Sequence, residues 1–407
     1  MTMNSPAVAT APVAQRETTP NTPAIFGGPP LFAEPLPMVH PELPPAEGLL
    51  QQFGQMLESG RLTNGETVDR LERAAARYLD VPECVAVSSC TLGLMLVEKC
   101  LGLSGQVIVP SFTFFATAHS LLWNGLEPVL VDCDGESWNL APERVLRAIG
   151  PRTSAILAVH ISGNPAAAGE LEEIAHHAQL RLIYDAAHAF GSSRQGAPVG
   201  GCGGAEVFSL SPTKLLVAGE GGLVATQDRE LARTLRAARN YGNEGDYDCR
   251  LAGLNARMTE FQAALGLAAL PLVDRHVERR NRLAALYEQY LGEEPGLSVQ
   301  QIRPQDRSAR KDFSIVIDEA RFGVSRDFLR QALEKENVPV RSYFDPPLHR
   351  QRLYLRYYFP EHDKLENSER ISRGVLSLPL YSRLKEADVI RIARRILEIR
   401  DWAAGRW

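Results

Sequence analysis

Two ionisable residues follow apolar stretches of the chain, where each is placed to take part in catalysis. Lys214 lies in FSLSPTKLLVAGEGG (208–222), after a short apolar run and before a glycine-rich turn. Apolar surroundings disfavour the ammonium form of a lysine, and the neutral amine is a nucleophile. Asp185 ends the apolar run RLIYD (181–185), where a buried carboxylate would bind a cation such as a protonated pyridine nitrogen. Outside such a site, Lys214 would be a surface charge and Asp185 a helix N-cap.

A lysine and an acid of this kind together suit pyridoxal 5'-phosphate (PLP), which forms a Schiff base with a lysine and needs an acid at its ring nitrogen. SSCTLGL (88–94) predicts the phosphate site, because a strand-to-helix turn offers hydroxyls and backbone N–H groups. Ser209 is placed to reach the same phosphate, and Phe114 to stack on the ring. Taken singly, Thr91 is more typical of a helix N-cap and Phe114 of a core aromatic.

Signatures of other ligands are missing from the sequence. No G-x-G-x-x-G opens a helix after a strand, and no G-x-x-x-x-G-K-[ST] occurs. No H-E-x-x-H or paired Cys/His spacing is found either, so we expect no metal site. The missing glycine fingerprint also makes a nicotinamide dehydrogenase a weak alternative.

The composition is that of an ordinary globular protein, with 44% hydrophobic and 23% charged residues among 407. Lys and Arg number 44 against 49 Asp and Glu, a net charge of −5, so we expect no nucleic-acid polymer as a partner. No run of about 18 apolar residues occurs, and we expect no membrane contact. The six cysteines form no C-x-x-C pair, which indicates free thiols and a cytoplasmic location.

Short apolar runs alternate with helical patterns along the first half of the chain. The candidate strands are 84–88, 107–111, 128–132, 155–160, 181–185, 206–210 and 222–227. The candidate helices between the first five are 91–101, 115–123, 142–149 and 169–177. This alternation predicts a mostly parallel sheet covered on both faces, with mixed direction at the last two strands. Ligands of such sheets bind beyond the carboxyl ends of the strands, where His160, Asp185 and Ser209 fall.

The chain divides into three parts. Residues 1–23 are rich in Ala, Thr and Pro and are expected to form a disordered tail. Residues 24–270 form the large domain and 271–407 the smaller one, with the boundary inside a long helical pattern that Pro271 interrupts. The smaller part carries a candidate strand at 312–318, helices at 326–336 and 385–402, and the loop YFDPPLH (343–349). His349 in this loop and His160 are candidates for substrate contact.

The chain resembles the DegT-type PLP-dependent nucleotide-sugar aminotransferases over roughly residues 24–399. The segments that carry the resemblance follow in order: SSCTLGL, PSFTFFAT, YDAAHAFG, FSLSPTKLLVAGEGG, GLNARMTEFQAALG and YFDPPLH. The resemblance implies the aspartate-aminotransferase-like α/β fold, a large domain with a mostly parallel seven-stranded sheet plus a smaller C-terminal α+β domain. It also implies a homodimer with shared active sites, and amino transfer from glutamate or glutamine to a keto-sugar nucleotide.

By this resemblance Lys214 corresponds to the Schiff-base lysine and Asp185 to the partner of the pyridinium. The other assignments are the phosphate cup at Cys90 (backbone), Thr91 and Ser209, the stacking ring of Phe114, and His188 near the ring hydroxyl of the cofactor. Asn255 corresponds to the asparagine that reaches the phosphate from the partner subunit, and Arg257 lies beside it as a candidate for substrate binding.

The motifs also depart from the family pattern. Ser89-Cys90 stands where Asn-Gly or Ser-Gly is usual, Leu215 stands in place of Asn, and Ala256 and Tyr241 replace other common residues. Three alternative functions remain open at this point. An aminocyclitol aminotransferase is suggested by GGPPLF (27–32), a related sugar dehydratase would have a histidine in place of Lys214, and a PLP-binding regulator would not need the complete site.

Overall fold

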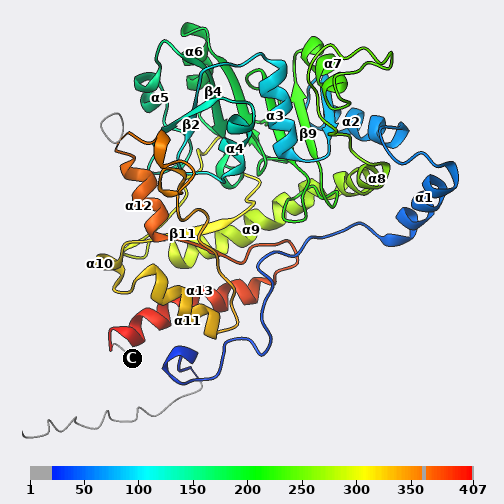
Figure 1. The fold of residues 1–407 in the computed structure, drawn as a ribbon. Helices are drawn as coiled ribbons and strands as arrows, with labels where there is room; N and C mark the ends of the chain where they lie inside the picture. The colour runs from blue at the N-terminus through cyan, green and yellow to red at the C-terminus, as the bar shows by residue number, and fades with distance from the viewer. Residues whose placement is uncertain (1–20, 360–363, 406–407) are drawn as a thin grey trace, which may run out of the picture.

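The computed structural model describes residues 21–359 and 364–405 of the chain (Figure 1). Most of the expected disordered tail, 1–23, therefore lies outside the described residues. The last residues of that range are described, and Thr22 among them is buried. No helix in the described part of the chain is long and apolar enough to cross a lipid bilayer.

A seven-stranded sheet forms the centre of the large unit, and all seven strands were predicted from the sequence. Its strands are β1 (Glu83–Val87), β2 (Gln106–Pro110), β3 (Glu127–Val131), β4 (Thr153–Val159), β5 (Arg181–Asp185), β8 (Ala205–Ser209) and β9 (Gly222–Thr226). Their order is β1-β9-β8-β5-β4-β2-β3. The strand β9 runs opposite to the other six, because the loop 210–221 joins it to β8 without a crossover helix. That loop carries Lys214.

Helices cover both faces of this sheet (Figure 1). They are α2 (Glu66–Tyr78), α3 (Cys90–Cys100), α4 (Ala116–Trp123), α5 (Pro142–Ala148), α6 (Ala168–His177), α7 (Arg229–Ala238) and α8 (Glu260–Ala269). Alternate side chains of one strand enter opposite layers: Val207 packs with α3, α4 and α7, and Phe208 with α2 and α8. Burial of both faces explains why the strands are continuous apolar runs.

The C-terminal unit is built on a small antiparallel sheet of β10 (Leu297–Val299), β11 (Phe313–Ile317) and β12 (Val375–Leu378). Its helices are α9 (Val273–Leu291), α10 (Glu319–Phe322), α11 (Arg326–Lys335), α12 (Glu366–Gly374) and α13 (Glu386–Ala403). Sequence patterns predicted β11, α11 and α13, whereas β10 and β12 are too short to give a periodic signal. Pro271 lies in the 3₁₀ turn Leu270–Leu272 that separates α8 from α9, close to the expected boundary.

The N-terminal segment packs on the C-terminal unit, although the sequence-based boundaries assign it to the large domain. Phe26 stacks on Trp402 with ring centroids 5.8 Å apart. The buried Glu336 accepts hydrogen bonds from the backbone N–H groups of Ala24 (2.6 Å) and Leu31 (2.7 Å). The chain then passes to α1 (Ala46–Ser59), which packs on α8. Two short strands, β6 (Ser193–Arg194) and β7 (Ala197–Pro198), complete the structure.

Candidate active site

A pocket of about 370 Å³ lies where the carboxyl ends of β5 and β8 meet the start of α3. Seven of the residues predicted from the sequence line it: Cys90, Thr91, Phe114, Asp185, His188, Ser209 and Lys214. They come from four separate segments of the chain. The topology brings them together because parallel strands end at one edge of the sheet.

Asp185 is held rigidly at the base of this pocket. The side chain is 5% exposed, and its Oδ2 accepts a hydrogen bond of 2.7 Å from Thr117 Oγ1 on α4. The backbone N–H of Ala187 donates to Oδ1 at 3.1 Å. Burial raises the pKa of Asp185, while these two hydrogen bonds and the nearby Lys214 favour the carboxylate. The result is an oriented acid in a site with little solvent.

Lys214 is carried by the loop between β8 and β9. Burial, and after it the nearby ammonium of Lys311, lower the pKa of its amine from 10.5 to about 8. Asp312 and Asp185 act in the opposite direction. The surroundings of Lys214 thus shift its amine toward the neutral form, in the direction that the apolar sequence around it predicted.

The turn into α3 offers the anion site expected from SSCTLGL. Cys90 and Thr91 begin the helix, where backbone N–H groups have no acceptor within the helix. Ser89 Oγ caps the helix by accepting from Leu92 N at 3.2 Å. The Cys90 thiol donates to the carbonyl of Val207 at 3.5 Å, so this side chain is directed at β8. A Cβ on Gly222 would lie 2.8 Å from Cys90 N, so β9 approaches the turn this closely only with glycine there.

His188 and Phe114 form two further walls of the pocket. His188 Nδ1 accepts from the backbone N–H of Ser162 at 3.2 Å. Burial holds the pKa of His188 well below its usual range, so the ring is neutral and Nε2 carries the proton. The ring of Phe114 is 43% exposed, and its centroid lies 5.9 Å from that of Phe344.

Several pocket residues were missed by the sequence analysis, among them Glu220, Lys311, Asp312, Tyr343 and Phe344. Lys311 and Asp312 directly precede β11, and no motif marks them. Tyr343 and Phe344 belong to the loop YFDPPLH, which the sequence analysis did single out. Within that loop only His349 was predicted to contact the substrate, because its imidazole can be charged or can form hydrogen bonds.

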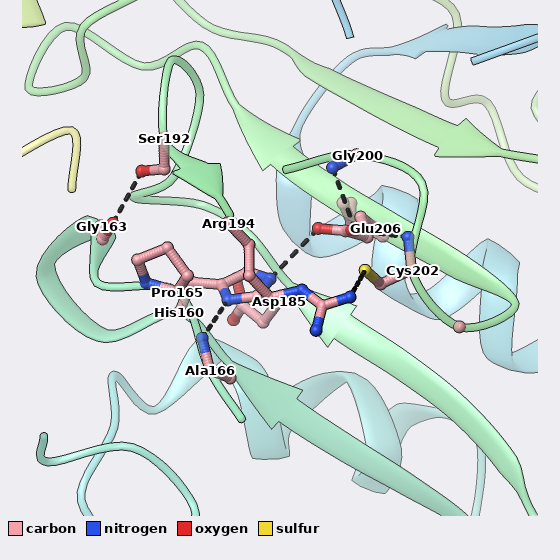
Figure 2. Close-up of polar contacts among 12 residues, drawn as sticks. His160, Gly163, Pro165, Ala166, Asp185, Ser192, Arg194, Gly200, Cys202 and Glu206 are labelled. Carbon is pink, nitrogen blue, oxygen red and sulfur yellow. Dashed lines mark hydrogen bonds and ion pairs between the residues drawn. The ribbon is translucent and has the colours of Figure 1, made fainter. Parts of the chain in front are cut away.

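The structure places His160 outside the pocket wall, in polar contact with Glu206 and Ala166 (Figure 2). Its side chain is 2% exposed, and Nε2 lies 3.1 Å from Glu206 Oε2. Nδ1 accepts from the backbone N–H of Ala166 at 2.9 Å. Glu206 Oε1 in turn accepts from the N–H groups of Gly200 (3.0 Å) and Cys202 (2.8 Å). Both ring nitrogens are therefore used within the protein, which makes His160 a structural residue beneath the site.

His349 is likewise absent from the pocket wall. It is buried, with Nδ1 2.6 Å from Ser111 Oγ and Nε2 2.8 Å from Glu369 Oε1. These contacts fix the loop YFDPPLH against β2 and α12. The expected position of His349 at the mouth of the site is thus taken by Tyr343 and Phe344.

Asn255 and Arg257 do not line the pocket of their own chain. Asn255 is exposed, on a strand-like segment that bridges to Asn240. Arg257 Nη1 donates to Asn240 Oδ1 at 2.7 Å, and its guanidinium lies 5.3 Å from the ring centroid of Tyr241. The chain alone therefore gives these two residues no contact with the site.

No group of three or more His, Cys, Asp or Glu side chains is arranged to hold a metal ion in 21–359 and 364–405. The six cysteines, all within these ranges, are free thiols.

Comparisons with known proteins define the class of this fold and site. A model of the DegT/DnrJ/EryC1/StrS aminotransferase family matches residues 46–397. The structure of DesI in the presence of its TDP-sugar product superimposes with a TM-score of 0.88, is 38% identical, and covers 95% of this chain and 98% of its own. The fold is thus that of the PLP-dependent sugar aminotransferases, as the resemblance implied.

The chain belongs to the DegT/DnrJ/EryC1/StrS aminotransferase family and is a sugar aminotransferase. The dTDP-4-amino-4,6-dideoxy-D-glucose transaminase of Escherichia coli is 30% identical over 89% of this chain and 98% of its own length. The dTDP-3-amino-3,4,6-trideoxy-alpha-D-glucose transaminase of Streptomyces venezuelae is 33% identical over 86% and 91%. Both relatives take part in amino-sugar biosynthesis by transamination, which is the activity predicted from the sequence.

Proposed function

We propose that this protein uses PLP, bound at Lys214, to transfer an amino group from glutamate or glutamine to a keto-sugar nucleotide. The observation that carries the proposal is the meeting of Lys214, Asp185 and the start of α3 in one pocket. Relatives named for dTDP-sugars support a sugar joined to a nucleoside diphosphate as the acceptor. The free cysteines support action in the reducing cytoplasm.

The pocket residues suit PLP by their chemistry. Lys214 supplies an amine whose pKa is lowered to about 8, and Asp185 a buried carboxylate for the pyridinium nitrogen. Cys90 N–H, Thr91 and Ser209 would hold the phosphate at the positive end of α3. The exposed ring of Phe114 offers a flat surface for the cofactor ring.

PLP, when bound, supplies an electron sink that stabilises negative charge on the carbon next to the amino nitrogen of a substrate. The chain's own contribution is to orient and protonate. Lys214 Nζ, with its lowered pKa, would take a proton from that carbon and deliver it to the carbon on the other side of the amino nitrogen, the shift that amino transfer requires. Asp185 would keep a proton on the pyridine nitrogen, and Thr117 holds Asp185 through a hydrogen bond to Oδ2. His188, neutral with its proton on Nε2, is a hydrogen-bond donor for an oxygen in the pocket.

We further propose that the active unit is a homodimer. Asn255 and Arg257 are exposed or half-buried outside the pocket of their own chain, as residues that serve a partner's site would be. An amide and a guanidinium are suited to bind a phosphate group.

The test combines cofactor mapping with an acceptor screen. Borohydride reduction of the PLP-loaded protein, followed by peptide mapping, is expected to place the cofactor on Lys214. The pyridoxamine-loaded enzyme is then mixed with 3-keto and 4-keto sugar nucleotides and with a free keto-cyclitol, and recovery of the visible absorbance is recorded. Recovery with a keto-sugar nucleotide supports the proposal. Labelling of another lysine contradicts the site, and recovery with the cyclitol alone contradicts the acceptor.

A further inference from the structure

An ion pair from the C-terminal unit faces the pocket beside the residues described above. Lys311 Nζ lies 2.7 Å from Asp312 Oδ1, and both residues line the pocket although they are only 5% and 7% exposed. Burial of two charges costs free energy unless their surroundings compensate for it. The two charges act on the pKa of Lys214 in opposite directions, and the cofactor-binding arrangement proposed above gives the pair no ligand to bind, so its place in the pocket wall needs another explanation.

Hydrogen bonds to both backbone groups of Lys311 hold this pair in place. The N–H of Lys311 donates to the carbonyl of Ser162 at 2.9 Å, and Arg280 Nη1 donates to the carbonyl of Lys311 at 2.9 Å. Ser162 also donates its own N–H to His188 Nδ1. The ion pair and His188 are thus held by the same turn after β4, so their relative positions in the pocket are set before any ligand enters.

The pair presents both hydrogen-bond donors and an acceptor. An ammonium has three N–H donors, of which Asp312 Oδ1 takes one. An added carboxylate or phosphate would be attracted by Lys311 and repelled by Asp312. A hydroxyl group both accepts and donates, so it suits the two residues together. Two aromatic rings nearby also favour a sugar hydroxyl as the ligand. Lys311 Nζ lies 5.3 Å from the ring centroid of Tyr343, and Phe344 lines the same pocket.

We propose that Lys311 and Asp312 bind a ring hydroxyl of the acceptor sugar, with Tyr343 and Phe344 against its apolar face, and so determine which sugars are accepted. The proposal rests on the proposed function, because it assumes a nucleotide sugar in this pocket. Lys311 donates to the hydroxyl oxygen and Asp312 accepts its proton in a hydrogen bond. A sugar that lacks this hydroxyl leaves a buried charged pair unsatisfied, a loss that strongly discriminates between substrates.

The experiment compares the PLP-loaded wild-type enzyme with Lys311→Met, Asp312→Asn and a matched control, Glu288→Gln. The control removes the ion pair of Arg310 with Glu288 (2.6 Å), which lies next to Lys311 in sequence but not in the pocket wall. The probes are dTDP-4-amino-4,6-dideoxy-D-glucose, its analogues deoxygenated at C2 or at C3, and dTDP alone. Binding is measured by calorimetry and by titration of the cofactor absorbance, and the half-reaction with glutamate is timed separately.

We expect the wild-type enzyme and Glu288→Gln to bind the parent sugar at least about tenfold more tightly than one of the deoxy analogues. In Lys311→Met and Asp312→Asn this preference disappears, while the Kd of dTDP stays unchanged. Retention of the preference in both variants overturns the inference alone. A rise in the glutamate concentration that half-saturates the half-reaction, with dTDP-sugar binding unchanged, overturns it in favour of donor binding. Absence of binding of dTDP and of every dTDP-sugar to the wild-type enzyme would overturn the proposed acceptor as well.

Discussion

Thr117 Oγ1 donates a hydrogen bond of 2.7 Å to Oδ2 of Asp185, which joins helix α4 to the end of strand β5 at the base of the pocket. The same hydroxyl lies 3.0 Å from Thr113 Oγ1 in the loop before α4, so Thr113 supports Thr117 in turn. Burial alone would favour protonation of Asp185, and the Thr117 hydrogen bond opposes it. Thr117 is therefore a positioning residue whose hydrogen bond also favours the carboxylate form of Asp185.

Replacement Thr117→Val is expected to lower kcat by roughly 10- to 100-fold, because a hydrogen bond to a charged group contributes about 1.5–3 kcal/mol. Loss of this bond also raises the pKa of Asp185 further, so the acidic limb of the pH–rate profile moves to higher pH. The profile is measured with saturating cofactor. Thr117→Ser, which retains the hydroxyl, is expected to recover most of the activity. A Thr117→Val enzyme with the wild-type profile would contradict the role of this bond.

The lowered pKa of Lys214 predicts unusual reactivity of the cofactor-free protein. Labelling of Lys214 by an amine-specific reagent is expected to rise with a midpoint near pH 8, because the neutral amine is the reactive form. An ordinary exposed lysine has its midpoint at about pH 10.4. Peptide mapping by mass spectrometry over a pH series gives both midpoints from one sample. A midpoint for Lys214 equal to that of the other lysines would show that burial does not disfavour its ammonium.

The same shift predicts how the stability of the cofactor-free protein depends on pH. The folded-state pKa lies below the unfolded one, so the unfolded chain binds more protons between about pH 8 and 10.5. The free energy of unfolding therefore rises with pH through this range. Below pH 8 the folded protein bears the full free-energy cost of burying the ammonium. Lys214→Met should then be more stable than wild type at pH 7, by about 1–3 kcal/mol, and equal to it above pH 10.5. Denaturant titrations at pH 7 and above 10.5 measure the difference.

His160 is expected to contribute to stability rather than to substrate affinity. Removal of its imidazole in His160→Ala leaves Glu206 Oε2 buried without its N–H donor, and an unsatisfied buried acceptor costs about 1–3 kcal/mol. Thermal unfolding should show a clear loss, while the KM of the acceptor sugar stays unchanged in the fraction that folds. The conservative variant His160→Gln provides the matched control, because it keeps a polar group near Glu206. A raised KM with unchanged stability would instead support substrate contact.

The sequence predicted the central sheet better than the surroundings of the site. Strands such as β5 and β8 are buried on both faces, so their continuous apolar runs and the polar residue that ends each one are visible without a structure. Lys311 and Asp312 were missed because they enter the pocket through the packing of the C-terminal unit on the turn at Ser162. His160, in contrast, was predicted to contact the substrate but does not line the pocket. Its position at a strand end suggested the site, but its ring is turned to Glu206 on β8 of the same sheet.

The placement of Asn255 and Arg257 outside the pocket of their own chain leads to the last prediction, which concerns assembly. If these residues serve the partner's site, each active site takes Lys214 from one subunit and Asn255 from the other. Two inactive variants, Lys214→Ala and Asn255→Ala, should then complement each other. In a mixed dimer one site contains both substitutions and the other contains neither.

Equal mixing with free exchange of subunits is expected to restore about a quarter of the wild-type specific activity, because half of the dimers are mixed and each has one intact site. Activity is measured after exchange has been verified by native mass spectrometry of differently tagged subunits. A mixture of Lys214→Ala with Asp185→Asn is the matched control, since both residues line the pocket of the same chain and a mixed dimer has no intact site. Recovery confined to the first mixture supports the shared site. Absence of recovery after verified exchange, or an active monomer in light scattering, would place the complete site within one chain.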